Sequence, residues 1–266
     1  MPKTKSSPRT KTTHKAAPST VHTTVTRTSA ARTKNYKNVL QGDLKVGPLF
    51  AELVGSFGLV ALLLTTNGNA IVAGITILFF TMAFGRLSGG HVNPAVTVAL
   101  LATRKISAVR AAGYIVAQLL GAMLALVIIT QFTHGAASVQ DPYTGQMTQP
   151  KVFAVTALAG DWRPFFAEAL GAVILGLGVA AAKFKKRGDL EAGYLIGGAL
   201  ILGMLLATQG STAVLNPAAA LGLDGYKLEN MWTITVYAIA PLLGVAAGAW
   251  LYKLLQWDEK GEVEEA

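Results

Sequence analysis

The sequence predicts an all-α membrane protein, with six transmembrane helices and two re-entrant half-helices arranged as an inverted repeat of three spans plus three. Three observations favour this fold class. The 266 residues are 52% hydrophobic and only 14% charged, whereas soluble domains carry about 25% charged residues. Six apolar segments along the chain are long enough to cross a bilayer. The tripeptide Asn-Pro-Ala occurs twice, each time at the start of an apolar segment too short to cross.

Residues 1–46 form a basic tail ahead of the first apolar segment. They hold ten Lys or Arg and one Asp, so the net charge of +9 lies entirely in this tail. Because it is rich in Ser, Thr, Lys and Pro, the tail is expected to be disordered. It has no apolar stretch of the kind found in secretory signals. We favour a solvated cytoplasmic tail; a polybasic segment on anionic lipid and an organelle transit peptide are the alternatives.

A membrane domain is expected from 47 to 255, followed by a short acidic tail from 256 to 266. A transmembrane helix needs about 20 predominantly apolar residues. Six segments meet this need, at 47–66, 69–86, 107–131, 163–183, 191–209 and 231–255. Two shorter apolar pieces, 93–102 and 216–223, each begin at an Asn-Pro-Ala.

The basic residues of the loops predict that both termini are cytoplasmic, because cytoplasmic loops carry an excess of Lys and Arg. The loops between the second and third spans and between the fourth and fifth spans contain Arg104, Lys105, Arg110, Lys183, Lys185, Lys186 and Arg187. The segment 65–69 contains no basic residue, and 132–162 contains a single lysine. The loop at Asn93 then enters from the cytoplasm and the loop at Asn216 from outside, and we expect the plasma membrane.

The two halves of this domain are repeats of each other. The matching motifs are AELVG (51–55) with AEALG (167–171), NPAVTVAL (93–100) with NPAAALGL (216–223), and AQLLGA (117–122) with APLLGV (240–245). Since each half has three spans, an odd number, the second half is inverted relative to the first. Interrupted spans at matching positions of inverted repeats place a substrate path at the repeat interface, near the bilayer midplane.

The Asn-Pro-Ala units have a physical explanation in this arrangement. Proline suits the first turn of a helix, and a preceding asparagine can cap that turn. Each unit therefore predicts the N-terminus of a half-helix. Two half-helices entering from opposite faces would meet with their positive dipole ends together, beside the amides of Asn93 and Asn216, which can donate hydrogen bonds.

At these residues the chain resembles the major intrinsic protein family, the aquaporins and aquaglyceroporins. The motifs that carry the resemblance are SGGHVNPAVT, the second NPA, the glutamates of the two AE pairs and YIVAQLLGA. The resemblance runs from about residue 47 to 255, so it implies an aquaporin-like channel domain. A lone Asn-Pro-Ala would be weak evidence, but two within matching inverted halves are specific.

The resemblance implies a role for each matched residue. Asn93 and Asn216 would donate hydrogen bonds to a central water and oppose proton passage, together with the half-helix dipoles. Glu52 and Glu168 would support the re-entrant loops rather than relay protons, and His91 would line the pore on its cytoplasmic side. The pore motifs as a whole comprise Asn93, Pro94, Ala95, Asn216, Pro217 and Ala218.

The chain departs from the family at the outer constriction. Family members usually have arginine directly after the second Asn-Pro-Ala, where this chain has Ala219. The resemblance places the other constriction positions at Ala73, Met204 and Ala213. Three alanines and one flexible methionine predict an opening wider and more apolar than in a strict water channel. The aspartate that marks glycerol-conducting members is also absent, since Ala220 stands in its place.

We therefore expect a passive channel for water, with small uncharged solutes such as glycerol as further candidates, assembled as a homotetramer in contact with membrane lipid. No cofactor, metal or nucleic-acid partner is expected. An enzyme is disfavoured, since the chain has no cysteine and His14, His22 and His134 lie in the tail or a loop. The alternatives are a secondary transporter, which would need coupling-ion ligands, and a non-conducting anchor for the basic tail, which would leave the Asn-Pro-Ala pair unexplained.

Overall fold

The computed structural model describes residues 44–134, 136–140, 145–148, 152–226 and 229–264. The chain divides into two units, Met1–Val39 and Leu40–Ala266, and every element below belongs to the second. Most of the predicted basic tail therefore lies outside the described residues. The helices and strands are α2 (Val46–Thr65), α3 (Ala70–Phe84), α4 (Pro94–Ala102), α5 (Ala108–Thr133), β1 (Val139–Gln140), β2 (Met147–Thr148), α6 (Trp162–Phe184), α7 (Asp189–Ala207), α8 (Pro217–Gly222), α9 (Trp232–Ile234), η1 (Thr235–Ile239) and α10 (Ala240–Glu264).

Within the described residues, five helices are long and apolar enough to cross a membrane: α2, α5, α6, α7 and the helix formed by α9, η1 and α10. The predicted span 69–86 corresponds to α3, which has only 15 residues. At 1.5 Å per residue, α3 alone is about 22 Å long, shorter than the hydrocarbon core of about 30 Å. Hydrogen-bonded turns prolong it, because the N–H groups of Ser88 and Gly89 donate to the carbonyl oxygens four residues earlier (both 3.0 Å).

The last span differs from its prediction in two ways. After the single turn α9, it contains a π-helical stretch, η1, which has Tyr237 at its centre. Extra-wide turns of this kind occur mostly as single-turn bulges inside α-helices, frequently at functional sites. The helix α10 then continues past Leu255 to Glu264, so no break in the helix marks the start of the predicted acidic tail.

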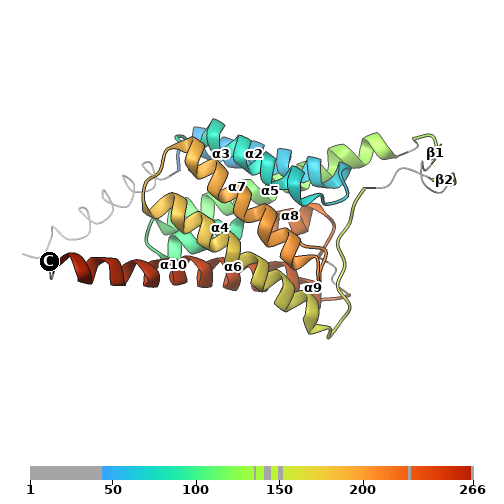
Figure 1. Cartoon of the computed structure of the whole chain (residues 1–266). Helices are drawn as coiled ribbons and strands as arrows, with labels where there is room; N and C mark the ends of the chain where they lie inside the picture. Colours follow the sequence, from blue (N-terminus) through green and yellow to red (C-terminus); the bar gives the residue numbers. More distant parts are fainter. Residues whose placement is uncertain (1–43, 135, 141–144, 149–151, 227–228, 265–266) are drawn as a thin grey trace, which may run out of the picture. The chain divides into compact units, whose positions relative to one another are not determined.

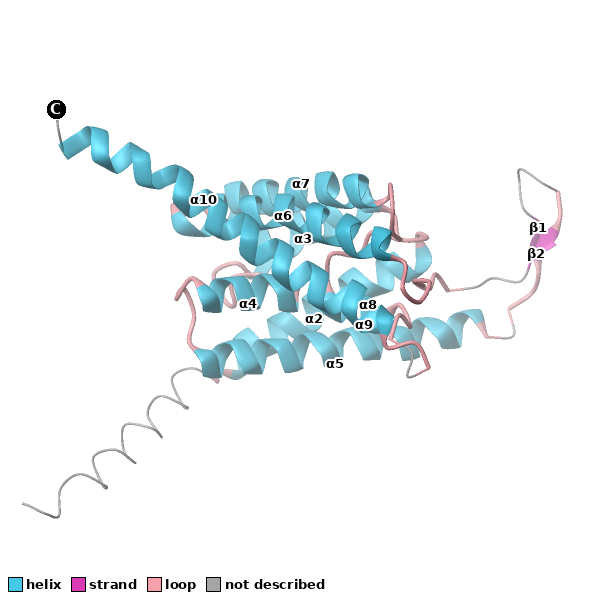
Figure 2. Ribbon diagram, turned by 90° about the horizontal axis from the view of Figure 1, so that it is seen from below, coloured by secondary structure: helices cyan, strands magenta, loops and turns pink. Residues whose placement is uncertain are grey.

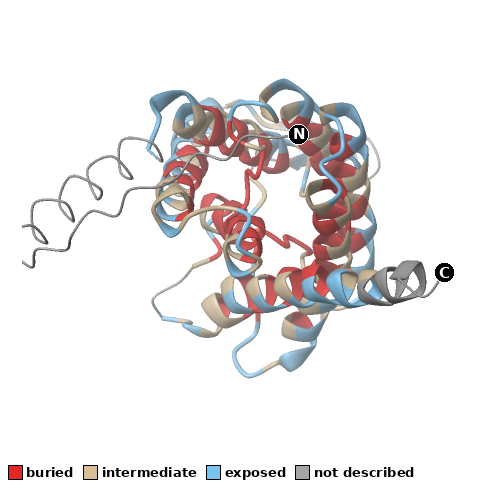
Figure 3. Cartoon of the chain, turned by 90° about the vertical axis from the view of Figure 1, so that its left-hand side faces the viewer, coloured by how far each residue is buried: buried red, intermediate tan, exposed pale blue. Residues whose placement is uncertain are grey.

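The helices pack as two matching sets (Figures 1 and 2). In the first half α2 packs against α5, in the second α6 packs against α10, and α3 packs against α7 across the two halves. Small residues permit these approaches. A Cβ at Gly197 of α7, for example, would lie 2.5 Å from the carbonyl oxygen of Gly74 in α3. The buried residues lie on the faces that the helices turn toward one another (Figure 3).

The half-helices α4 and α8 are inserted between the two sets. Each packs against a helix of the opposite half, α4 against α10 and α8 against α5, and they contact each other. We call the end of the bundle at which α2 begins and α6 ends the α4 end, and the opposite end the α8 end (Figure 1). Both half-helices run outward from the middle of the bundle, so their N-termini face each other there.

Candidate functional site

The site begins with the two asparagines that cap the half-helices. The Oδ1 of Asn93 accepts a hydrogen bond from the N–H of Ala95 (2.8 Å), and the Oδ1 of Asn216 accepts from Ala218 (3.0 Å) and Ala219 (3.2 Å). Proline follows each asparagine at the first helical position. Both caps are therefore made locally, by residues two or three positions apart, as expected for this sequence pattern.

The other end of each asparagine side chain joins the two halves. The Nδ2 of Asn93 donates to the carbonyl oxygen of Leu215 (2.9 Å), and the Nδ2 of Asn216 donates to the carbonyl oxygen of Val92 (2.9 Å). These partners lie 122 and 124 residues apart in the chain. An amide nitrogen carries two hydrogens, so each asparagine has a second N–H beyond the one that binds the opposite loop.

The loops before the asparagines adopt an uncommon backbone conformation. Val92 has φ 48° and Leu215 has φ 53°, so both are left-handed, as are Gly90 (61°) and Ala213 (57°) two residues earlier. A left-handed residue other than glycine costs about 1–2 kcal/mol. This conformation presents the carbonyl oxygens of Val92 and Leu215 to the opposite asparagines, and other contacts have to hold it in place.

Two buried glutamates supply those contacts. Glu52 of α2 accepts hydrogen bonds from the N–H groups of His91 (2.9 Å) and Val92 (2.6 Å). Glu168 of α6 accepts from the N–H groups of Val214 (2.9 Å) and Leu215 (2.8 Å). Neither side chain is exposed. Each carboxylate uses both of its oxygens to accept these loop N–H groups.

The repeat is broken around these glutamates, and here sequence reasoning missed two residues. In the first half the Nε2 of Gln118 donates to Glu52 (2.7 Å). The matching position in the second half is Pro241, which cannot donate, and the hydroxyl of Ser211 donates to Glu168 instead (2.7 Å). The signal for Gln118 was present in the alignment of AQLLGA with APLLGV. The signal for Ser211 was its match with Ser88, since each serine lies five residues before its asparagine.

His91 lies beside Asn93 on the same loop. Its Nδ1 is 3.2 Å from the hydroxyl oxygen of Thr97, and its ring meets the ring of Tyr114 edge-on, at 5.2 Å between centroids. Together with the asparagines it borders a small cavity of about 10 Å³. This volume is the space that the centre of a water molecule can occupy, and it suffices for about one water. The cavity is lined by Ile77, His91, Asn93, Val96, Leu175, Ile196, Leu200 and Asn216.

All four predicted constriction residues are buried: Ala73, Met204, Ala213 and Ala219. Ala73 precedes cavity-lining Ile77 by one helical turn on α3, and Met204 follows cavity-lining Leu200 by one turn on α7. Residues four apart share a helix face, so both lie on the faces that border the cavity, one turn nearer the α8 end. Nearby, the hydroxyl of Tyr237 is 2.7 Å from that of Thr212 and donates to the carbonyl oxygen of Thr156 (2.7 Å).

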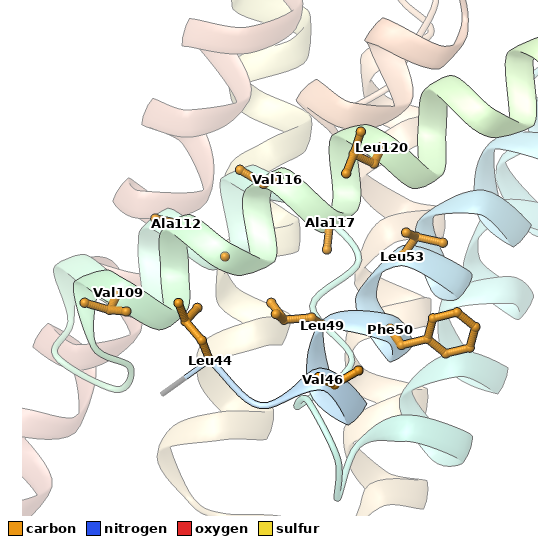
Figure 4. A pocket seen from close by; sticks show the side chains of 11 residues that line it. Leu44, Val46, Leu49, Phe50, Leu53, Val109, Ala112, Val116, Ala117 and Leu120 are labelled. Atoms are coloured by element: carbon orange, nitrogen blue, oxygen red, sulfur yellow. The ribbon is translucent and has the colours of Figure 1, made fainter. Parts of the chain in front are cut away.

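A larger groove of about 660 Å³ lies between α2 and α5 (Figure 4). Its lining comprises aliphatic side chains, one phenylalanine and one glycine, and it contains none of the predicted site residues. Phe50 and Val116 in its lining are exposed on the outside of the bundle. Without a polar group this groove cannot orient a polar molecule, so the candidate path is the cavity between the asparagines. No cluster of His, Cys, Asp or Glu suited to a metal ion occurs in the described part of the chain.

Comparisons with known proteins give matches over most of the chain. The family model of the major intrinsic proteins matches residues 51–252. Nodulin-26 of Glycine max is 32% identical over 229 residues, which cover 80% of this chain and 79% of that protein. Glycerol uptake facilitator protein-like 6 of Lactiplantibacillus plantarum is 32% identical over 218 residues, covering 77% of this chain and 96% of that protein.

A solved structure supports the same fold. The aquaglyceroporin from Plasmodium falciparum matches with a TM-score of 0.52 at 21% sequence identity, over 78% of this chain and 91% of that chain. At this level of identity the likeness concerns the fold alone. It confirms the predicted all-α membrane fold of the aquaporin type.

Proposed function

Because the chain belongs to the major intrinsic protein family, a family of channels, we propose that it conducts water and small uncharged solutes such as glycerol through the cavity between Asn93 and Asn216. One observation carries this proposal. Two asparagine amides, each at the N-terminus of a half-helix, border a single cavity with room for about one water. A site that served only to cap two helices would not need to bring the caps together from positions more than a hundred residues apart.

The geometry supports a specific action on a passing water. Each asparagine gives one N–H to the opposite loop and keeps a second for the cavity. The positive N-terminal ends of both half-helix dipoles also face this cavity, from opposite sides. Together they would bind the oxygen of a central water and turn its hydrogens outward. A water held in this orientation cannot accept a proton from its neighbours in the row, which opposes proton passage.

The apolar residues at the α8 end support solute passage. Ala73, Ala213 and Ala219 remove bulk at three of the four predicted constriction positions, and Met204 has an unbranched, adaptable side chain. We infer an opening wide enough for a molecule of about the size of glycerol. The similarity to a glycerol uptake facilitator-like protein is consistent with this inference.

The assembly and the orientation in the membrane belong to the same proposal. We infer a multi-pass protein of the plasma membrane that forms homotetramers, with both termini and the α4 end cytoplasmic. The alternative of a coupled transporter is less well supported, because Glu52 and Glu168 are both engaged by loop N–H groups and offer no open ligand for a coupling ion. The channel proposal includes no chemical step, so no catalytic role is assigned.

Osmotic water flux into proteoliposomes, measured by stopped-flow light scattering, tests the proposal. Asn216→Leu should lower the permeability per inserted protein about tenfold or more, which corresponds to a barrier increase of about 1.4 kcal/mol. The matched control is Asn69→Leu, because Asn69 caps α3 through the N–H groups of Ile71 and Val72 but is exposed. Equal flux through both variants would mean that Asn216 is only a cap.

A further inference from the structure

The side chain of Lys183 lies at an unusual place for a lysine at the end of a membrane span. Such lysines normally extend along the helix toward the interface. The Nζ of Lys183 instead donates a hydrogen bond to the carbonyl oxygen of Gly89, at 2.5 Å. Gly89 belongs to the loop that leads through His91 to Asn93. The ammonium group therefore meets the loop that borders the candidate path.

The surroundings of Gly89 locate this charge beside the path. A Cβ at Gly89 would lie 3.0 Å from the Nε2 of His91 and 3.9 Å from the Nζ of Lys183. The imidazole and the ammonium thus border the same small space, and His91 also lines the central cavity. The exposed Lys185, two residues further on, has no such contact among the described residues.

The charge of Lys183 is not cancelled by an ion pair. Among the described residues the ion pairs are Arg86 with Asp189, Arg163 with Asp161, and Arg187 with Glu191. Two carboxylates act on Lys183 from a distance, Asp189 and Glu52. The first is already paired with Arg86 at 3.1 Å, and the second accepts the N–H groups of His91 and Val92.

The two ends of the path differ in polarity although they are related by the repeat. Thr81 lies 12 residues before Asn93, as Met204 lies 12 residues before Asn216. The buried hydroxyl of Thr81 has no hydrogen-bond partner in the described part of the chain. This hydroxyl faces Gly90, since a Cβ added at Gly90 would lie 3.3 Å from its oxygen. The loop at the α4 end therefore has the charged group of Lys183 beside it, whereas the four predicted constriction positions at the α8 end carry no charge.

We propose that Lys183 is the residue that excludes cations from the path, and that this barrier lies at the α4 end instead of at the constriction of the α8 end. A fixed positive charge in a narrow, poorly solvated opening repels a cation far more strongly than in water. An uncharged water or glycerol molecule is not repelled. Two further N–H groups of the ammonium also remain to bind the oxygen of an entering water. This inference rests on the proposed function, because it assigns a selectivity residue to the same path.

The test uses the full chain in proteoliposomes and measures two fluxes for every variant. Osmotic water flux reports that the pore is folded and open, and K⁺ flux, followed with a K⁺-sensitive dye, reports the barrier. Lys183→Met keeps an unbranched side chain, one atom shorter, and removes the charge. Lys183→Arg keeps the charge, and Lys183→Glu reverses it. Lys185→Met is the matched control, because it removes an exposed lysine of the same helix end.

We expect the ratio of K⁺ to water flux to rise about tenfold or more in Lys183→Met and further in Lys183→Glu, following the sign of the charge. Lys183→Arg and Lys185→Met should match the native ratio. Suppose that the native chain conducts water and that Lys183→Met and Lys183→Glu both keep the native ratio of K⁺ to water flux. That result would overturn this inference alone. A native chain without osmotic flux would contradict the proposed function as well. If Lys183→Met fails to insert, Lys183→Gln takes its place in the series.

Discussion

The loop before the second half-helix depends on Glu168, and replacing this residue by glutamine tests how the loop is held. The carboxylate accepts three hydrogen bonds, from the hydroxyl of Ser211 (2.7 Å) and the N–H groups of Val214 (2.9 Å) and Leu215 (2.8 Å). Hydrogen bonds to a charged group contribute about 1.5–3 kcal/mol each. These hydrogen bonds offset the strain of the left-handed conformation of Ala213 and Leu215, which costs about 1–2 kcal/mol per residue.

Glutamine changes this balance without changing the size of the side chain. Its one oxygen can keep the bonds to Ser211 and Val214, now worth about 0.5–1.5 kcal/mol each. Its NH₂ group faces the N–H of Leu215, which loses its acceptor at a cost of about 1–3 kcal/mol. The remaining stabilisation is then no larger than the strain, so the loop should leave its conformation and withdraw the carbonyl of Leu215 from Asn93.

Two measurements on Glu168→Gln check this reasoning. Osmotic permeability per inserted protein should fall about tenfold or more, and hydrogen exchange at the amides of Val214 and Leu215 should accelerate, because local opening becomes easier. Glu191→Gln, at an exposed glutamate, is the control and should change neither quantity. Normal permeability together with unchanged exchange at both amides would refute the idea that charge-assisted hydrogen bonds hold this loop.

Three further predictions concern the α8 end and the tail. Ala219→Arg should cut glycerol flux far more than water flux, since it adds bulk and a fixed charge to the predicted constriction. A native channel that excludes glycerol in the same proteoliposome assay would show that Met204 or another residue already closes the opening. Tyr237→Phe should lower the free energy of unfolding by about 1–3 kcal/mol, because the hydroxyl of Thr212 and the carbonyl of Thr156 lose their hydrogen-bond partner. An unchanged thermal unfolding midpoint would argue that a water molecule takes the place of the tyrosine hydroxyl. Deleting residues 1–40 should leave permeability per inserted protein intact, since the sequence of this polar segment shows no apolar periodicity. Lost conduction in correctly inserted protein would assign the tail a role in the pore.

Local patterns in the sequence determined the elements of this protein. The spans follow from apolar runs of about 20 residues, and the half-helices begin at Asn93 and Asn216 because asparagine followed by proline is a cap within three residues of its partners. The repeat of motifs likewise predicted that Glu52 and Glu168 occupy matching places. Two spans were mistaken in extent. The second is shorter than predicted, because α3 ends at Phe84 before the glycine-rich stretch that continues it as turns. The last is longer, because α10 continues to Glu264.

The tertiary structure decided which of these elements meet. The bonds from Asn93 to Leu215 and from Asn216 to Val92 join positions more than 120 residues apart. No pattern within either half specifies them, because they form only when both halves pack together. The same holds for Lys183 and Gly89, 94 residues apart. From the sequence alone, Lys183 is one of four basic residues in a loop. Its ammonium reaches Gly89 only because α6 ends beside the loop that carries His91.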